Sequence, residues 1–269
     1  MLDLKELNRE GLIPGPDEGR EAFFLRVERF RKMRESSSIP LKDWEGAFAI
    51  TVPVYDIRPL FVSAYYEDKN LPFWQAAATW IEGDYPSIQL KTALKKGHFL
   101  GIYKREEILA HEAVHAARAA FSEPKFEEIL AYRTSKNPLR RFLGPLFQYS
   151  YESYVFIFLL VLTLALDMVH VFYDLPSSIL FLKFLPFLAL LAGLLRLTKN
   201  KRTFFKCRQK LANLTPHPDH IMLRLSDKEI SLFAKMPENS IREYIDKEKE
   251  HSFRWQVISL NYSFVFNFK

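Results

Sequence analysis

The chain has 269 residues, enough for one large domain or two small ones, and 38 Lys and Arg against 32 Asp and Glu give it a net charge of +6. Nucleic acid is not expected as a partner, because no basic stretch is interleaved with a DNA- or RNA-reading motif. The single cysteine, Cys207, excludes an intramolecular disulfide framework and fits a reducing compartment.

The first half of the chain predicts a mixed α+β domain. An amphipathic helix is expected over residues 17–35, where apolar side chains recur at helical spacing. After it we expect a strand over 46–55, a helix over 71–81, and short strands over 86–94 and 98–103. Two more helices are expected over 104–121 and 125–134, separated by a break at Ser122 and Pro124.

The first of these last two helices carries the sequence AHEAVHAARAAF, residues 110–121. On a helix, His111 and His115 project from one face one turn apart, close enough for both imidazoles to bind one zinc ion. Glu112 is turned about 100° away, where it can reach a zinc-activated water rather than the metal. Catalytic zinc usually takes a third protein ligand. The next helix offers Glu127 and Glu128, and we expect Glu128 to be that ligand.

The motif HEAVH followed by EILA on a second helix resembles the gluzincin group of zinc metallopeptidases, over roughly residues 95–135. The resemblance implies a zincin-like catalytic domain in which His111, His115 and Glu128 bind Zn²⁺ and Glu112 is the general base. It also implies that residues 98–103 form an edge strand that holds an extended peptide. The separation between His115 and Glu128 is shorter than in thermolysin. In the membrane-embedded prenyl-protein proteases, the third glutamate lies much farther downstream.

Two apolar segments, residues 154–173 and 179–197, predict a transmembrane hairpin, because each is long enough to cross about 30 Å of hydrocarbon. Lys and Arg are concentrated before the first segment and after the second, and the turn between the segments carries none. The positive-inside rule therefore predicts an integral membrane protein with both termini and the active site on the cytoplasmic side. A site-2-type protease is disfavoured, because the sequence YKREEILAHE is too polar to enter lipid.

Three polar residues of the hairpin, Asp167, His170 and Lys183, lie toward its outer end. Helical rise puts Asp167 and Lys183 at similar depths, which predicts an ion pair that holds the two segments together. A proton or ion relay in a transporter assembled from several hairpins is the alternative interpretation of the same residues.

The C-terminal region, residues 199–269, begins with basic residues and contains an expected helix over 226–236. Ser226 and Glu229 have the spacing of a capping box. The aromatic and β-branched segment 255–268 predicts a strand or an interfacial segment. His217 and His220 resemble metal ligands but have no third partner in the sequence.

These patterns predict three parts: a zincin-like domain over 1–150, the transmembrane hairpin over 151–198, and a C-terminal region over 199–269. The leading hypothesis is a membrane-anchored zinc endopeptidase that hydrolyses extended peptide or protein substrates, with the lipid bilayer as its other partner. Tyr132 could donate a hydrogen bond to the oxyanion, and Arg118 is expected to pair with a carboxylate and fix the helices. The alternative is a non-catalytic membrane scaffold in which zinc only joins two helices. The sequence leaves the natural substrate and the oligomeric state open.

Overall fold

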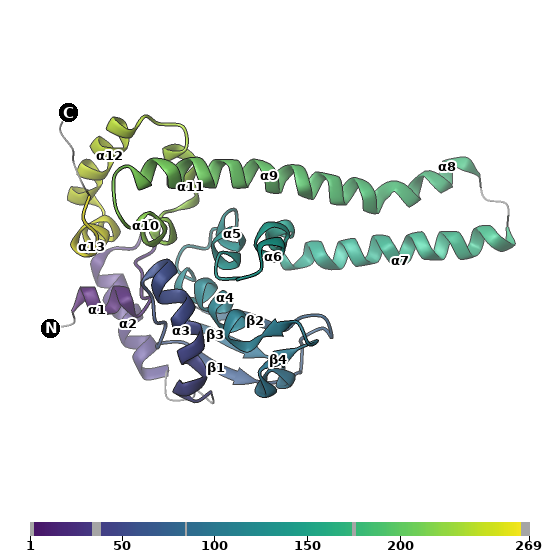
Figure 1. Cartoon of the computed structure of the whole chain (residues 1–269), viewed down its shortest axis with the longest axis horizontal. Helices are drawn as coiled ribbons and strands as arrows, with labels where there is room; N and C mark the ends of the chain where they lie inside the picture. Colours follow the sequence, from purple (N-terminus) through teal and green to yellow (C-terminus); the bar gives the residue numbers. More distant parts are fainter. Residues whose placement is uncertain (1–2, 34–38, 84, 174–175, 265–269) are drawn as a thin grey trace.

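The computed structural model describes residues 3–33, 39–83, 85–173 and 176–264. A mixed α+β body carries two long helical segments that project from it side by side (Figure 1). The α+β class is therefore confirmed. The body begins with helices α1 (Leu4–Arg9), α2 (Arg20–Met33) and α3 (Leu41–Tyr55), followed by strands β1 (Ser63–Tyr66), β2 (Ala77–Glu82) and β3 (Tyr85–Leu90).

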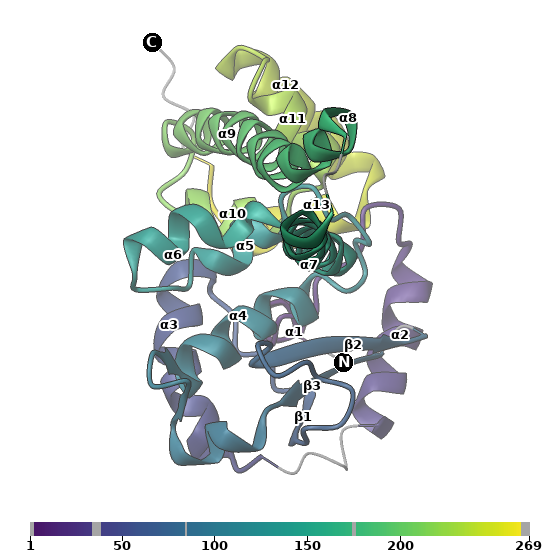
Figure 2. The same ribbon diagram turned by 90° about the vertical axis from the view of Figure 1, so that its right-hand side faces the viewer.

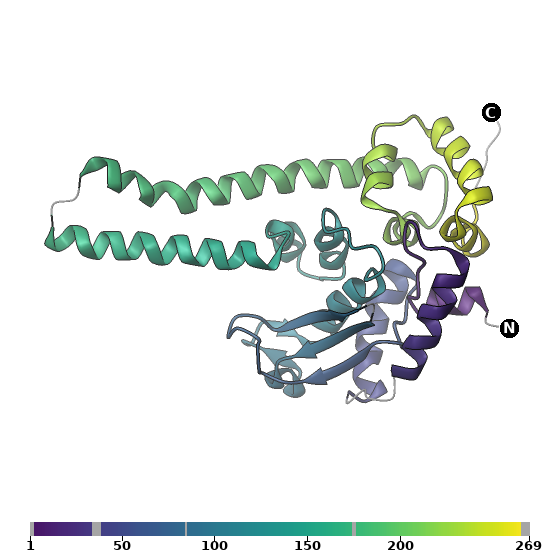
Figure 3. The ribbon, with the colours of Figure 1, turned by 180° about the vertical axis from the view of Figure 1, so that it is seen from behind.

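The three strands form one sheet in the order β1-β3-β2, seen from behind in Figure 3. β1 runs parallel to β3, and β2 runs antiparallel to β3, with Ala77 opposite Leu90 and Glu82 opposite Tyr85. β2 is consequently an edge strand that pairs with no second strand among the described residues.

The predicted strand over 46–55 is wrong, because this segment belongs to α3. The apolar side chains that α3 buries have the period of a helix, and Pro53 lies on the exposed side of its last turn: Trp44, Ala47, Phe48, Thr51 and Tyr55 are buried. An amphipathic helix therefore fits the segment better than a sheet edge. By contrast, the helix predicted over 17–35 is confirmed as α2 over its described part, with Phe23, Val27 and Phe30 buried.

The helix predicted over 71–81 is also wrong, since residues 77–82 form β2. Its alanines favour a helix, but Thr79, Trp80 and Ile81 favour a strand, and the pairing with β3 decides the outcome. β3 covers the first part of the strand predicted over 86–94, and a 3₁₀ helix, η2 (Thr92–Lys96), forms the rest.

The strand predicted over 98–103 is instead a tight hairpin of β4 (His98–Phe99) and β5 (Tyr103–Lys104), separate from the three-stranded sheet. Leu100 and Gly101 turn the chain with φ of 50° and 71°. A continuous strand cannot pass through such a turn, so this segment is not the edge strand expected to hold a peptide.

Helix α4 (Arg105–Ala117) lies between two hydrophobic cores. Leu109, Ala110 and Ala113 pack with α2, α3 and the sheet, whereas Val114 and Ala117 pack with the C-terminal helices. The small side chains let α3 and the sheet approach α4 closely. The HEAVH motif is therefore on a helix enclosed by both cores. It is followed by α5 (Glu127–Tyr132), α6 (Pro138–Leu143) and the 3₁₀ turn η3 (Gly144–Leu146).

The two projecting segments are long and apolar enough to cross a membrane, and their side chains are mostly exposed rather than packed in a core. The first is α7 (Ser150–Phe172). The second is a short helix α8 (Ser177–Leu180), a 3₁₀ turn η4 (Phe181–Phe184) and α9 (Leu185–Ala212). Lys183 Nζ lies 2.5 Å from Asp167 Oδ1, which confirms the predicted ion pair. Residues 174 and 175 of the turn lie outside the described residues.

α9 continues well past residue 197, and its second half buries Phe204, Cys207 and Leu211 in the body. The chain ends with α10 (Pro218–Arg224), α11 (Asp227–Phe233), α12 (Glu238–His251) and α13 (Phe253–Asn261). The capping box of Ser226 and Glu229 is confirmed. The strand or interfacial segment predicted over 255–268 is wrong for residues 255–261, which lie in α13 with Trp255 fully buried. Residues 265–268 lie outside the described residues.

Residues 199–269 do not stand apart from the first half of the chain. Arg224 is fully buried and donates hydrogen bonds to Asn8 Oδ1 at 2.7 Å and to the Tyr55 carbonyl at 3.0 Å. Phe253 and Val257 belong to the core that surrounds the sheet. The division of the chain into three parts stays a prediction, but the first and third parts share their packing.

Candidate metal centre

The histidines of the HEAVH motif lie on the second and third turns of α4, and α5 crosses close to them. Glu106 and Glu107 stabilise the first turn of α4 through the helix dipole. The left-handed φ of 51° at Ser122 reverses the chain, so that α5 packs against α4. This reversal needs only a short connection, so Glu128, the third candidate ligand, lies close to His115 in the sequence.

Three donor groups converge between these helices. His111 Nε2 and His115 Nε2 are 3.2 Å apart. Glu128 Oε2 lies 3.7 Å from His111 Nε2, and Glu128 Oε1 lies 3.5 Å from His115 Nε2. Zinc bonds of about 2.0–2.1 Å at tetrahedral angles require donors roughly 3.3–3.4 Å apart. His111, His115 and Glu128 also form the one group of potential metal ligands found among the described residues. Donor chemistry and spacing therefore both fit zinc.

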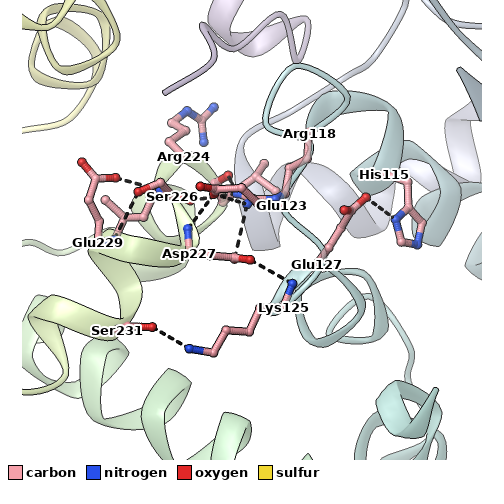
Figure 4. A network of polar contacts seen from close by, with 12 residues as sticks. His115, Arg118, Glu123, Lys125, Glu127, Arg224, Ser226, Asp227, Glu229 and Ser231 are labelled. Atoms are coloured by element: carbon pink, nitrogen blue, oxygen red, sulfur yellow. Dashed lines mark hydrogen bonds and ion pairs between the residues drawn. The ribbon is translucent and has the colours of Figure 1, made fainter. Parts of the chain in front are cut away.

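Glu127 does not point to the same space as Glu128. Its Oε1 lies 2.7 Å from His115 Nδ1, the ring nitrogen opposite the one that faces Glu128 (Figure 4). A carboxylate in this position fixes the ring orientation and tautomer of a metal-binding histidine. The two adjacent glutamates thus have different geometric roles, one as a candidate ligand and one as the partner of a candidate ligand.

Glu112 is buried beside this group and is held from the sheet. Thr79 Oγ1 on β2 donates a hydrogen bond to Glu112 Oε2 at 2.7 Å and also lies 3.3 Å from the Glu112 carbonyl. Sequence reasoning missed this contact, because the segment around Thr79 was expected to be a helix. β2 therefore contacts the carboxylate that is expected to act as the base.

The ionisation of the group follows from its burial and its carboxylates. Burial holds the pKa of His111 well below its ordinary value. Burial also lowers the pKa of His115, but Glu128 and Glu127 outweigh it and raise that pKa to about 10. Burial raises the pKa of Glu128 to about 7 and that of Glu112 above its usual range. Three carboxylates around two histidines make a site that favours a cation.

Tyr132 lies one turn beyond Glu128, and its ring centroid is 4.5 Å from that of His111. Gly144 makes room for the Tyr132 side chain, since a Cβ at that position would clash with the Tyr132 ring. Burial raises the pKa of Tyr132, so its hydroxyl stays protonated and able to donate a hydrogen bond.

Arg118 anchors the end of α4 to the C-terminal helices (Figure 4). It is fully buried and donates hydrogen bonds to the carbonyls of Leu223 and Leu225 at 2.7 and 2.9 Å. Glu123 and Asp227 lie 3.8 and 3.9 Å from it. The expected pairing of Arg118 with carboxylates is confirmed, and it joins the helices of the candidate site to residues 223–227.

The candidate ligands line a cavity of about 720 Å³. One wall is β2 and the segment before it, and the opposite wall is formed by α5 and the start of α7. Arg140 also lines the cavity, pairs with Glu107 at 3.0 Å and lies over the ring of Tyr103, 4.3 Å from its centroid. The cavity that contains the candidate ligands is therefore bordered by β2, the edge strand of the sheet.

The remaining polar candidates lie elsewhere. His217 and His220 stack on each other with ring centroids 4.9 Å apart, far along the chain from the α4 histidines, and they are not part of a metal group among the described residues. Cys207 is buried, and burial raises the pKa of its thiol. Comparison with known proteins finds no matching family model, no similar curated protein and no similar solved structure.

Proposed function

We propose that this protein is a zinc-dependent endopeptidase held on the membrane by the α7–α9 hairpin, with its active site on the cytoplasmic side. The observation that carries the proposal is the convergence of His111, His115 and Glu128 within a cavity that also contains Glu112. A site built only to join two helices has no need of a buried carboxylate beside the ligands, nor of an open cavity in front of them.

In this proposal His111, His115 and Glu128 hold the metal, and Glu127 keeps the His115 ring in place. Zinc, when bound, would supply a Lewis acid that acidifies a water molecule and polarises a carbonyl group. Glu112 would accept the proton of the attacking water at Oε1, because Thr79 holds Oε2. The same carboxyl group would then deliver the proton to the leaving amine. Tyr132 would donate a hydrogen bond to the developing oxyanion.

The peptide substrate would pair with the free edge of β2, rather than with residues 98–103. Residues 77–79 of this edge and the preceding residues 75–76 line the cavity, and Thr79 contacts Glu112. Main-chain hydrogen bonds to an edge strand bind extended segments with little dependence on side chains. We therefore expect unfolded or extended stretches of protein to be the substrates.

Replacement of Glu112 by Gln tests the proposal, because Gln keeps the size of the side chain and removes the base. A positioned proton acceptor contributes on the order of 10²–10⁴ in rate. Glu112→Gln should lose nearly all cleavage of an extended peptide mixture by the detergent-solubilised protein, while zinc content and thermal stability stay at the wild-type level. The membrane scaffold predicts instead that the wild type cleaves nothing. Equal zinc-dependent cleavage by both forms would overturn the mechanism.

A further inference from the structure

The cavity in front of the candidate ligands extends to the start of the first membrane-spanning helix. Side chains of Phe147, Tyr149, Tyr154 and Ile157 line it together with His111 and Glu128. Trp74, which precedes β2, has its ring centroid 6.0 Å from that of Tyr154. In the view along the spans, α7 lies above β2 and α4 (Figure 2). A substrate in this cavity would therefore lie beside the point where α7 enters the bilayer.

Exposed apolar side chains lie next in sequence to residues that line the cavity, namely Trp74, Tyr103 and Arg140. Phe73 is 80% exposed, and Leu100, Ile102 and Leu139 are each 64% exposed. Arg140 of α6 donates a hydrogen bond to the Ile102 carbonyl at 3.0 Å, which joins the segments of Leu139 and Ile102, and Phe73 packs against Trp74, which contacts Tyr154 of α7. Clustered exposed apolar residues mark a contact surface. Because α7 leaves the body beside them, the headgroup region of the membrane is the surface that fits.

Residues 74–79, which lead into β2, connect this membrane surface to the candidate site. Trp74 contacts Tyr154 of α7, and Thr79 contacts Glu112. Thr79 lies five residues after Trp74, and five steps of roughly 3.3 Å per extended residue span at most about 17 Å. A chain that left the bilayer beside α7 and followed β2 would reach Glu112 after about five residues.

We infer that the substrates are membrane-anchored polypeptides, cut about five residues from the bilayer on the side of the catalytic body. This inference rests on the proposed function and adds the substrate class and the position of the cut. Anchoring in the same bilayer raises the effective concentration of a substrate to the millimolar range, and such tethering can increase apparent affinity 10²–10⁴-fold. A soluble peptide of the same sequence lacks this advantage.

The test uses the full-length protein in zinc-containing liposomes with a fluorogenic polar peptide of 25 residues. The peptide is offered in two forms, free in solution and fused to an inert transmembrane helix. We expect the anchored form to be cut at least 10²-fold faster at micromolar concentration, at about the fifth residue from its anchor. Insertion of ten Gly and Ser residues after the anchor should leave that distance unchanged, so that the cut falls within the insert.

Binding provides a readout that does not depend on turnover. In Glu112→Gln, a photoreactive residue at position five after the anchor should crosslink to β2, and one at position twenty should not. Phe73→Glu should slow cleavage of the anchored peptide severalfold and leave the free peptide unaffected. Leu25→Glu, at a 61% exposed leucine of α2, is the matched control and should change neither rate.

The outcomes separate the two claims. Equal rates for the free and anchored peptides, or a cut that stays in the original sequence after the insertion, would overturn the inference and leave the peptidase intact. Absence of zinc-dependent cleavage of both forms would overturn the proposed function and this inference together.

Discussion

Removal of the Glu127 carboxylate should weaken zinc binding without abolishing it. Glu127 Oε1 is 2.7 Å from His115 Nδ1, so the carboxylate fixes the ring that presents Nε2 to the metal, but it supplies no ligand atom. Loss of a group that hydrogen bonds a metal ligand typically costs 10–100-fold in metal affinity. This corresponds to about 1.4–2.7 kcal/mol of binding free energy for Glu127→Ala.

Competition with a chelator of known zinc affinity measures this effect. Zinc affinity should fall in the order wild type, Glu127→Gln, Glu127→Ala, since Gln can still accept a hydrogen bond from His115 but has no charge. Glu128→Ala, which removes a candidate ligand, should fall far below all three. If Glu127→Ala loses all zinc and Glu128→Ala retains it, the roles of the two glutamates are reversed and the reasoning from the donor distances is wrong.

Three further outcomes follow from the topology, the site and the buried network. Reporters fused at residues 140 and 215 should both behave as cytoplasmic, and an insertion at Ser177 should behave as external; opposite locations for 140 and 215 would exclude the hairpin. Thr79→Val should lower kcat/KM for a free peptide by about 10–100-fold, which corresponds to the free energy of a hydrogen bond to a charged group, and zinc content should not change. Full activity would show that Thr79 does not hold the base. Arg118→Met should reduce the free energy of unfolding by about 3–5 kcal/mol in urea titrations, because Glu123 and Asp227 would lose their buried cation. Arg9→Met, at a side chain that is 70% exposed, should change it by less than about 1 kcal/mol.

The sequence located the candidate site because its signals are local. His111 and His115 lie one helical turn apart, and any helix brings them to one face. The choice of Glu128 rather than Glu127 agrees with the donor distances, since Glu128 faces both Nε2 atoms. The ion pair of Asp167 and Lys183 was predictable in the same way, because helical rise fixes the depth of each residue in the hairpin.

Two of the errors concern segments whose structure depends on distant partners, whereas the error over 46–55 overlooked a helical period in the sequence itself. The alanines of 71–81 favour a helix, and only the pairing with β3 makes 77–82 a strand. The segment 255–261 is β-branched and aromatic, yet it is a helix because Trp255 fills the core beside Phe233 and Tyr244. The hydrogen bond from Thr79 to Glu112 spans 33 residues and depends on the sheet register, so no local pattern could indicate it.

Zinc content of the purified protein, wild type beside Glu128→Ala, tests the central claim most directly. After exhaustive dialysis against metal-free buffer, elemental analysis should find about one zinc ion per wild-type chain and far less than one in Glu128→Ala, with the helical content of the two proteins equal. His115→Ala should behave like Glu128→Ala. A wild-type protein without zinc that also takes up none when zinc is added, or equal zinc content in wild type and Glu128→Ala, would contradict the assignment of His111, His115 and Glu128 as the metal centre.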